Sequence, residues 1–180
     1  MKNKYAVYST IILIVVLVII IFGNTTLHLK NENVAKKIDV STALGTPVSE
    51  LTVDSLNTRV WFISQKENKK LMRTKIGKNM GIMKTDGMKM NSATKKAVMT
   101  GTHYFIFDVT NIRTKKEIAD STAKVQIVSP SKIIASVTLQ PMMYHFGGGI
   151  WLTEKGYYLF TINLDVGSSY KTTQFKYHVR

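Results

Sequence analysis

The chain has 180 residues, carries 25 Lys and Arg against 11 Asp and Glu, has a formal net charge of +14 and contains no cysteine. The missing cysteines exclude thiol redox chemistry, zinc fingers, iron–sulfur clusters and c-type haem attachment. A chain of this length can bury a core without disulfides, so we expect one folded domain after an N-terminal segment.

The N-terminal stretch 5–22, YAVYSTIILIVVLVIIIF, is apolar and uncharged. As a helix it would reach roughly 27 Å, close to the ~30 Å hydrocarbon core of a bilayer. A cleaved secretory signal is the alternative, with Lys2 and Lys4 at its basic start, but the following GNTTLHL lacks the small-residue pair of a cleavage site. We therefore predict a cytoplasmic tail at 1–4 and a single transmembrane anchor at 5–23. The positive-inside rule places the rest of the chain on the extracytoplasmic side.

Residues 24–57 are polar and reach a Gly45-Thr46-Pro47 turn signal without sustained periodicity, which predicts a juxtamembrane linker. The folded domain is expected at 58–180. Its first strand candidate is 58–64, TRVWFIS, because β-branched and aromatic residues dominate it. Residues 65–75 are compatible with one short helix that exposes its lysines.

Residues 76–99 contain three glycines and no pattern that fits a regular element. We predict a long loop rich in methionine and lysine, a feature that is uncommon in a compact domain unless the loop binds something. It holds five methionines: Met80, Met83, Met88, Met90 and Met99.

Basic residues concentrate between residues 66 and 96, where ten Lys and Arg face only Glu67 and Asp86. A solvated basic face is the simplest interpretation. Outside the cytoplasm, the alternatives are that this segment binds the lipid head groups of the membrane or an acidic protein partner. Nucleic acid is not expected, because no nucleic-acid-binding motif accompanies the charge.

Six further segments read as strands separated by turn material. They lie at 103–109, 123–128, 133–139, 149–152, 157–166 and 170–179. No helix long enough for a parallel crossover lies between them. The sequence therefore predicts an all-β fold, an immunoglobulin-like antiparallel β-sandwich.

Enzymatic motifs are missing from the sequence, which has no HExxH, GxSxG or GxxxxGK[ST] pattern, so we do not expect an enzyme. The Gly147-Gly148-Gly149 run has no helix after it. A tight turn between strands is therefore a better interpretation than a phosphate-binding loop.

Soft metal ligands gather at two predicted strand ends. Met99 and His103 stand at the entry to one strand, and Met142, Met143 and His145 lie in the turn PMMYHFGGG. Thioethers and imidazoles suit Cu(I), whereas calcium and magnesium prefer oxygen ligands. If the two loops meet at one end of the sandwich, these five side chains would form a copper site with His103 and His145 as its nitrogen donors. Methionines that fill a core and histidines that only pack are the alternative.

Residues 102–130 and 139–164 resemble the small membrane-anchored or periplasmic β-sandwich domains of the YtkA-like and FixH-like kind. The landmarks are KEIADSTAKV at 116–125, the Pro141-Met142 pair, the glycine run and KGYY at 155–158. The resemblance implies an immunoglobulin-like sandwich, and some relatives are associated with copper handling or with assembly of copper-containing respiratory enzymes. Relatives with paired histidines differ from this chain, in which Tyr104 follows His103.

Two functions follow from the sequence. The first is a membrane-anchored extracytoplasmic protein that binds or delivers copper. The second is a non-catalytic accessory subunit that docks on a larger membrane protein complex without a metal of its own.

Overall fold

The computed structural model describes residues 40–81, 90–116, 118, 121–167 and 169–180. Residues Ile38–Arg180 form one compact unit. The predicted cytoplasmic tail and anchor lie outside the described residues. Within the described part, no helix has the length and apolar character needed to cross a membrane.

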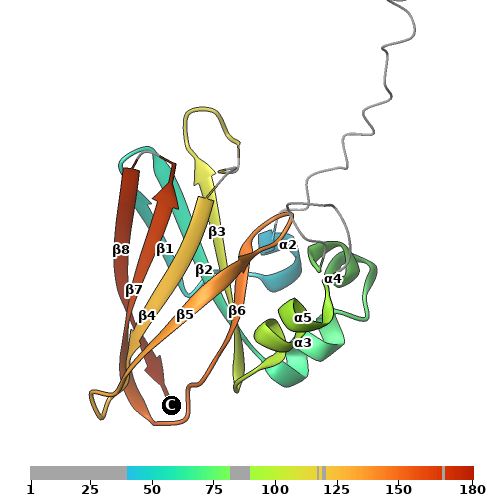
Figure 1. The fold of residues 1–180 in the computed structure, drawn as a ribbon, viewed down its shortest axis with the longest axis vertical. Coiled ribbons are helices and arrows are strands. Elements are labelled where there is room, and N and C mark those ends of the chain that lie inside the picture. The colour runs from blue at the N-terminus through green and yellow to red at the C-terminus, as the bar shows by residue number, and fades with distance from the viewer. Residues whose placement is uncertain (1–39, 82–89, 117, 119–120, 168) are drawn as a thin grey trace, which may run out of the picture. The chain divides into compact units, whose positions relative to one another are not determined.

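Eight antiparallel strands make up the domain (Figure 1). In chain order they are β1 (Ser49–Val53), β2 (Leu56–Ser64), β3 (His103–Asn111), β4 (Ser121–Val128), β5 (Ile134–Pro141), β6 (Phe146–Ile150), β7 (Gly156–Val166) and β8 (Ser169–Val179). They pair in the order β1-β2-β3-β6-β5-β4-β7-β8. The prediction of an all-β antiparallel fold is confirmed.

Strand β5 joins the two halves of the sheet. Residues Ile134 to Leu139 pair with β4, whereas Gln140 and Pro141 pair with β6. The strands therefore form one continuous order, not the two separate sheets of the predicted sandwich. The ends of this order approach each other, because Lys171 of β8 forms a 2.6 Å ion pair with Asp54 in the β1–β2 turn.

The main core lies between the two halves of this nearly closed sheet, and we call it the inter-sheet cluster. Phe105 and Phe107 of β3 are fully buried in it together with Phe160 of β7. Phe160 stacks on Phe175 of β8 with ring centroids 5.0 Å apart. Alternation along each strand places one apolar face inward, and burial of each such ring stabilises the fold by roughly 1.5–3 kcal/mol.

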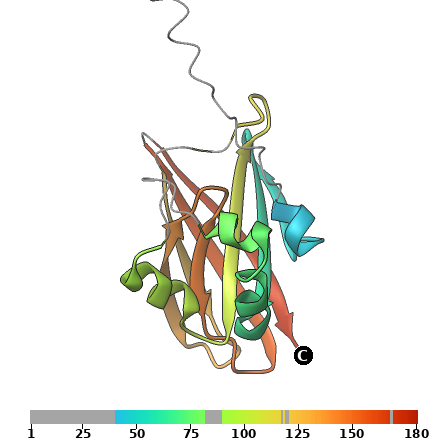
Figure 2. The same ribbon diagram turned by 90° about the vertical axis from the view of Figure 1, so that its right-hand side faces the viewer.

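A second core covers the outer face of β2 and β3 and lies under four short helices (Figure 2). The helices are α2 (Val40–Leu44), α3 (Gln65–Leu71), α4 (Lys75–Met80) and α5 (Ser92–Met99). We call this core the helix-covered cluster. It includes Tyr104 and Ile106, the residues of β3 that alternate with those of the inter-sheet cluster.

Each of the three helices α3, α4 and α5 begins at a side-chain cap. Ser64 and Glu67 form a capping box at α3, Thr74 accepts from the amide of Gly77 at 3.0 Å, and Asn91 accepts from the amide of Thr94 at 2.8 Å. Such caps satisfy amide groups that would otherwise lack partners, so they favour even short helices that pack on a sheet. The helix predicted at 65–75 begins where α3 begins, but its predicted end is wrong, because α3 ends at Leu71 and Lys75 begins α4.

Two predicted boundaries need correction. The loop predicted at 76–99 contains most of α4 and all of α5. Packing explains the glycine at position 77, since a Cβ on Gly77 would lie 1.8 Å from the carbonyl oxygen of Leu71. The linker predicted at 24–57 contains, in its described part, α2, β1 and the start of β2. Strand β1 escaped prediction because its middle residues are exposed and lack an apolar alternation.

Candidate metal site

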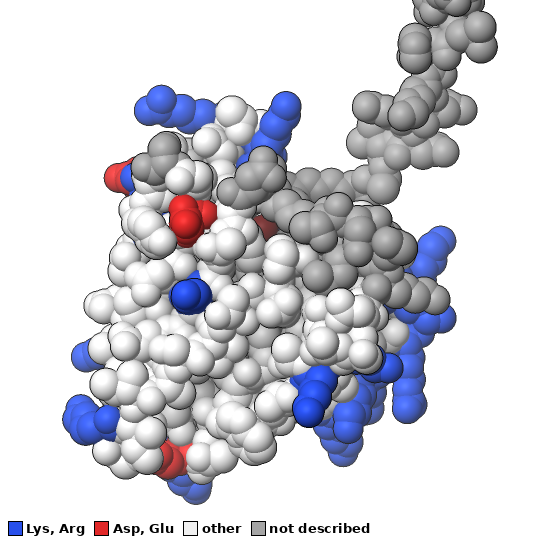
Figure 3. All heavy atoms as spheres, in the orientation of Figure 1, with Lys and Arg blue, Asp and Glu red and all other residues white. Residues whose placement is uncertain are grey.

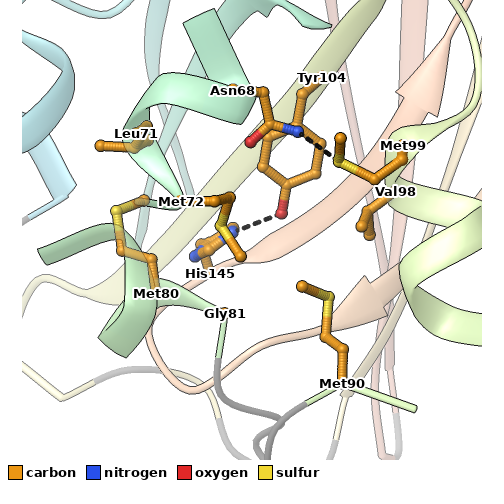
Figure 4. A pocket seen from close by; sticks show the side chains of 10 residues that line it. All are labelled: Asn68, Leu71, Met72, Met80, Gly81, Met90, Val98, Met99, Tyr104 and His145. Carbon is orange, nitrogen blue, oxygen red and sulfur yellow. Dashed lines mark hydrogen bonds between the residues drawn. The ribbon is translucent and has the colours of Figure 1, made fainter. Parts of the chain in front are cut away.

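A small pocket lies between the outer face of β3 and the helices α3, α4 and α5 (Figure 4). Four methionines line it: Met72, Met80, Met90 and Met99. Its polar lining comes from Asn68, Tyr104 and His145. Its volume of about 10 Å³ matches a single ion or water molecule and is far too small for an organic ligand. We call it the methionine pocket.

His145 enters the pocket from the end of the turn that precedes β6. The amide of Met142 donates to the carbonyl oxygen of His145 at 2.8 Å and closes this turn. The side chain is only 5% exposed, and burial lowers its pKa to about 3. The imidazole is therefore neutral at physiological pH, as a metal ligand must be.

Tyr104 orients this imidazole. Its hydroxyl lies 2.9 Å from Nε2 of His145, and burial raises the pKa of the hydroxyl, so the group stays protonated. Nδ1 of His145 is buried and has no hydrogen-bond partner among the described residues. When Nε2 carries the proton and donates to Tyr104, Nδ1 presents a free lone pair. Metal-binding histidines commonly donate their second nitrogen to a neighbouring group in this way.

Two glycines of β6 make room for this arrangement. A Cβ on Gly147 would lie 1.9 Å from the Tyr104 hydroxyl, and one on Gly149 would lie 2.0 Å from the carbonyl oxygen of Thr100 after α5. The glycine run is part of a strand, so the prediction of a tight turn at these residues is wrong. The turn lies at 142–145 instead.

Asn68 of α3 is the second polar wall of the pocket and is only 1% exposed. The Nδ2 group of its side chain donates to Oε1 of Gln65 at 3.2 Å and to the sulfur of Met99 at 3.4 Å. Its Oδ1 has no hydrogen-bond partner among the described residues. The residues that line the pocket thus include two buried polar atoms without partners among the described residues, and each such atom costs about 1–3 kcal/mol unless something binds it.

The side chains of Met72 and Met90 approach each other near Gly81. A Cβ on Gly81 would lie 2.6 Å from the methyl carbon of Met72 and 3.5 Å from that of Met90. The missing side chain at Gly81 therefore leaves space in which these two flexible thioethers can adjust. Thioethers are soft donors, and together with an imidazole they suit Cu(I) far better than a hard cation.

Of the five predicted ligands, the structure brings only His145 and Met99 into the pocket. Met142 is 1% exposed and belongs to the helix-covered cluster, and Met143 packs against that cluster, but neither lines the pocket. Both residues precede His145 in the turn that the Met142 amide closes.

His103 lies apart from His145. It pairs with Ile150 at the far end of β6, whereas His145 immediately precedes Phe146, which pairs with Phe107. The four strand steps between these pairs separate them by roughly 13 Å, and His145 lies one residue beyond the second pair. His103 also alternates with Tyr104 and so lies on the opposite face of β3. Its Nδ1 is 2.9 Å from the hydroxyl of Thr102, and desolvation lowers its pKa, opposed by Glu67. The predicted pairing of His103 with His145 is not formed.

The sequence placed Met80 and Met90 in a methionine-rich loop but not among the ligands, and three further residues of the pocket escaped sequence reasoning: Asn68, Met72 and Tyr104. A signal existed for two of them, because Asn68 and Met72 are four residues apart and share one face of the predicted helix. Tyr104 could not be found, because its role depends on the register between β3 and β6. The described residues contain no group of three or more His, Cys, Asp or Glu side chains that could hold a metal.

No family model matches the chain, and no curated protein sequence matches it. The resemblance to YtkA-like and FixH-like domains therefore gains no support from these comparisons. Solved structures of similar fold exist at low identity.

Two of these structures are of FetP from uropathogenic Escherichia coli. A copper-bound variant has a TM-score of 0.48 and 14% identity, covering 75% of this chain and 92% of its own. An as-isolated form has a TM-score of 0.44 and 13% identity, covering 73% and 94%. A DUF4426 family protein from Pseudomonas aeruginosa has a TM-score of 0.40 and 11% identity, covering 73% and 96%. Similarity at this level does not show which residues of this chain form a functional site.

Proposed function

We propose that the protein binds one Cu(I) ion in the methionine pocket. Nδ1 of His145 supplies a nitrogen ligand, and thioether sulfurs from Met72, Met90 and Met99 complete the coordination. The observation that carries the proposal is the buried, neutral His145, which contacts Tyr104 through Nε2 and whose Nδ1 has no partner among the described residues, in a pocket lined by methionines.

The character of the ligands favours a monovalent soft ion. All of these donors are neutral, so they do not offset the charge of a divalent cation in a buried site. The helices around the pocket also carry a strong positive charge, which disfavours hard cations further. Flexible methionine side chains suit binding and release, so we propose a binding or delivery role and not catalysis. The apolar segment 5–22 supports a membrane-anchored, extracytoplasmic location for this role.

A matched pair of variants tests the ligand set. The triple variant Met72→Leu, Met90→Leu and Met99→Leu removes three pocket sulfurs at nearly constant volume, a change that usually costs less than about 1.5 kcal/mol per site. We expect Cu(I) affinity to fall at least a hundredfold in competition with a chromogenic Cu(I) chelator.

The control is the double variant Met142→Leu and Met143→Leu, which removes two neighbouring sulfurs that do not line the pocket. Its affinity should stay within threefold of the wild-type value. X-ray absorption at the copper edge should report sulfur scatterers together with one imidazole. Equal losses in the two variants, or copper bound only by nitrogen and oxygen, would refute this site. The alternative of an accessory subunit without a metal would then be favoured.

A further inference from the structure

The helices α3, α4 and α5 present a strongly basic surface to solvent. In the described residues 65–81 and 90–100, all basic side chains are exposed: three on α3, two on α4, two on α5, and Arg73 between the first two helices. Figure 3 shows Lys and Arg gathered on this side of the molecule. We call this surface the basic helical face.

Almost nothing in this part of the chain neutralises the charge. Glu67 is its only described acidic residue, and its carboxylate already accepts from the amide and hydroxyl of Ser64 at 2.8 and 2.7 Å. These hydrogen bonds lower the pKa of Glu67 and use the carboxylate to cap α3. The lysines therefore present their charge outward, where an anionic surface can receive it.

We propose that the basic helical face docks on an anionic phospholipid surface. Lysine provides seven of its eight charges, and lysine is a point charge suited to diffuse attraction to head groups. An acidic protein would more often be recognised by arginine, whose planar group pairs with carboxylates through two hydrogen bonds. The charge is also spread over three helices, with Ile76 of α4 partly exposed among the lysines at 37%.

Chain length permits this contact. If residues 5–22 are anchored, the 17 residues 23–39 span at most roughly 60 Å, a length that leaves the orientation of the domain to other interactions. Charge then decides which face turns to the lipid. The same three helices line the methionine pocket, so docking orients the pocket side of the domain toward the membrane. The lipid contact itself does not depend on whether copper is bound.

Vesicle sedimentation of the compact unit 38–180 tests the contact without the N-terminal segment. Both hydrophobic clusters lie within this unit, and circular dichroism checks its fold. The probes are vesicles of phosphatidylcholine alone and of phosphatidylcholine with phosphatidylglycerol at three to one. We expect at least tenfold stronger partition onto the anionic vesicles in 50 mM salt, with most of this difference lost in 500 mM salt.

Two variants with the same loss of net charge test whether the charge must lie on the basic helical face. Substitution of Lys66, Lys69, Lys95 and Lys96 by Gln removes half of the basic helical face, and partition should fall at least tenfold. The control replaces Lys116, Lys124, Lys155 and Lys176, which are equally exposed but lie outside the three helices. The control should change partition less than threefold.

Two results would overturn the proposal. One is equal partition of the wild-type unit onto neutral and anionic vesicles, which would favour an acidic protein as the partner. The other is an equal loss in both Gln variants, which would show an effect of net charge without a defined face. Copper is absent from this assay, so neither result bears on the proposed metal site.

Discussion

The two faces of strand β3 pack in different ways. Phe105 and Phe107 point into the inter-sheet cluster, where strands form both walls and aromatic rings contact one another. Tyr104 and Ile106 point into the helix-covered cluster, where short capped helices form the second wall. The inter-sheet cluster provides most of the apolar burial. Among the described residues, two of the three buried polar atoms without partners, Asn68 Oδ1 and His145 Nδ1, belong to residues of the methionine pocket beside the helix-covered cluster, whereas the third, Ser121 Oγ, lies at the start of β4. The helix-covered side is therefore the one suited to a site.

Methionine marks the same division. The buried inter-sheet cluster contains no methionine among the described residues, whereas Met80, Met142 and the partly buried Met90, Met99 and Met143 belong to the helix-covered cluster. Helices over a sheet leave irregular gaps that a flexible thioether fills well. Both side-chain packing and metal-ligand chemistry therefore favour methionine in the helix-covered cluster.

The largest expected effect comes from the inter-sheet cluster. Phe105→Ala removes a ring that is fully buried, with centroids 5.4 Å from Phe62 and 6.0 Å from Phe160. The free energy of unfolding should fall by about 4 kcal/mol in denaturant titrations. Cu(I) affinity of the remaining folded protein should stay unchanged, and a large loss of affinity would show that the two clusters are not independent.

Substitutions at two neighbouring glycines of β6 distinguish the contributions of the two faces to metal binding. Gly147→Ala places a Cβ against the Tyr104 hydroxyl, whereas Gly148→Ala meets Leu139 and Val137 at 2.9 and 3.2 Å on the inter-sheet side. Each change should cost about 1–3 kcal/mol of stability, measured by thermal unfolding. Only Gly147→Ala should weaken Cu(I) binding, because it displaces the group that orients His145. Equal affinities in the two variants would contradict this role of Tyr104.

Acid should destabilise the helix-covered cluster through His145. Its pKa of about 3 in the folded state lies below the ordinary value near 6.5, so the unfolded chain binds a proton first as the pH falls. The contribution of neutral His145 to the free energy of unfolding is therefore fully present above pH 6.5. It decreases below this pH, by about 1 kcal/mol between pH 7 and 5.5. Denaturant titrations should show this slope in the wild type and a smaller one in His145→Gln. His103, whose pKa is also lowered, remains in both proteins and cancels in the comparison. Identical slopes would mean that His145 is not buried as a neutral group.

The smallest expected change in stability belongs to a pair of tyrosines. Tyr104→Phe removes the hydroxyl next to His145, and Tyr158→Phe removes a hydroxyl that accepts from the amide of Glu154 at 2.8 Å beside the inter-sheet cluster. Each should cost about 1 kcal/mol. Cu(I) affinity should fall about tenfold in Tyr104→Phe alone, since loss of the group that orients a ligand has this effect. A similar loss in Tyr158→Phe would argue against a local cause.

Residue alternation allowed much of the fold to be predicted. The pattern of 58–64 and 157–166 predicted strands that agree with β2 and β7, because one face of each is buried against a wide apolar surface. The same reasoning missed β1, which is an exposed edge, and it placed the strand at 149–152 where β6 spans Phe146–Ile150, because the glycines of β6 have no side chain to show alternation. The helices α4 and α5 were missed, since their caps and tertiary packing stabilise segments of weak intrinsic preference.

The sequence by itself determined the chemistry that the candidate site can use: soft sulfur and nitrogen donors without a thiol, set in a basic segment. Only the tertiary structure decided which of these donors meet. The register between β3 and β6 separates His103 from His145, whereas the side chain of Tyr104, on the other face of β3, passes Gly147 and reaches His145. The helices then bring Met72 and Met90 to the same pocket. Such meetings depend on strand register and packing between distant segments, and local residue patterns carry no information about either.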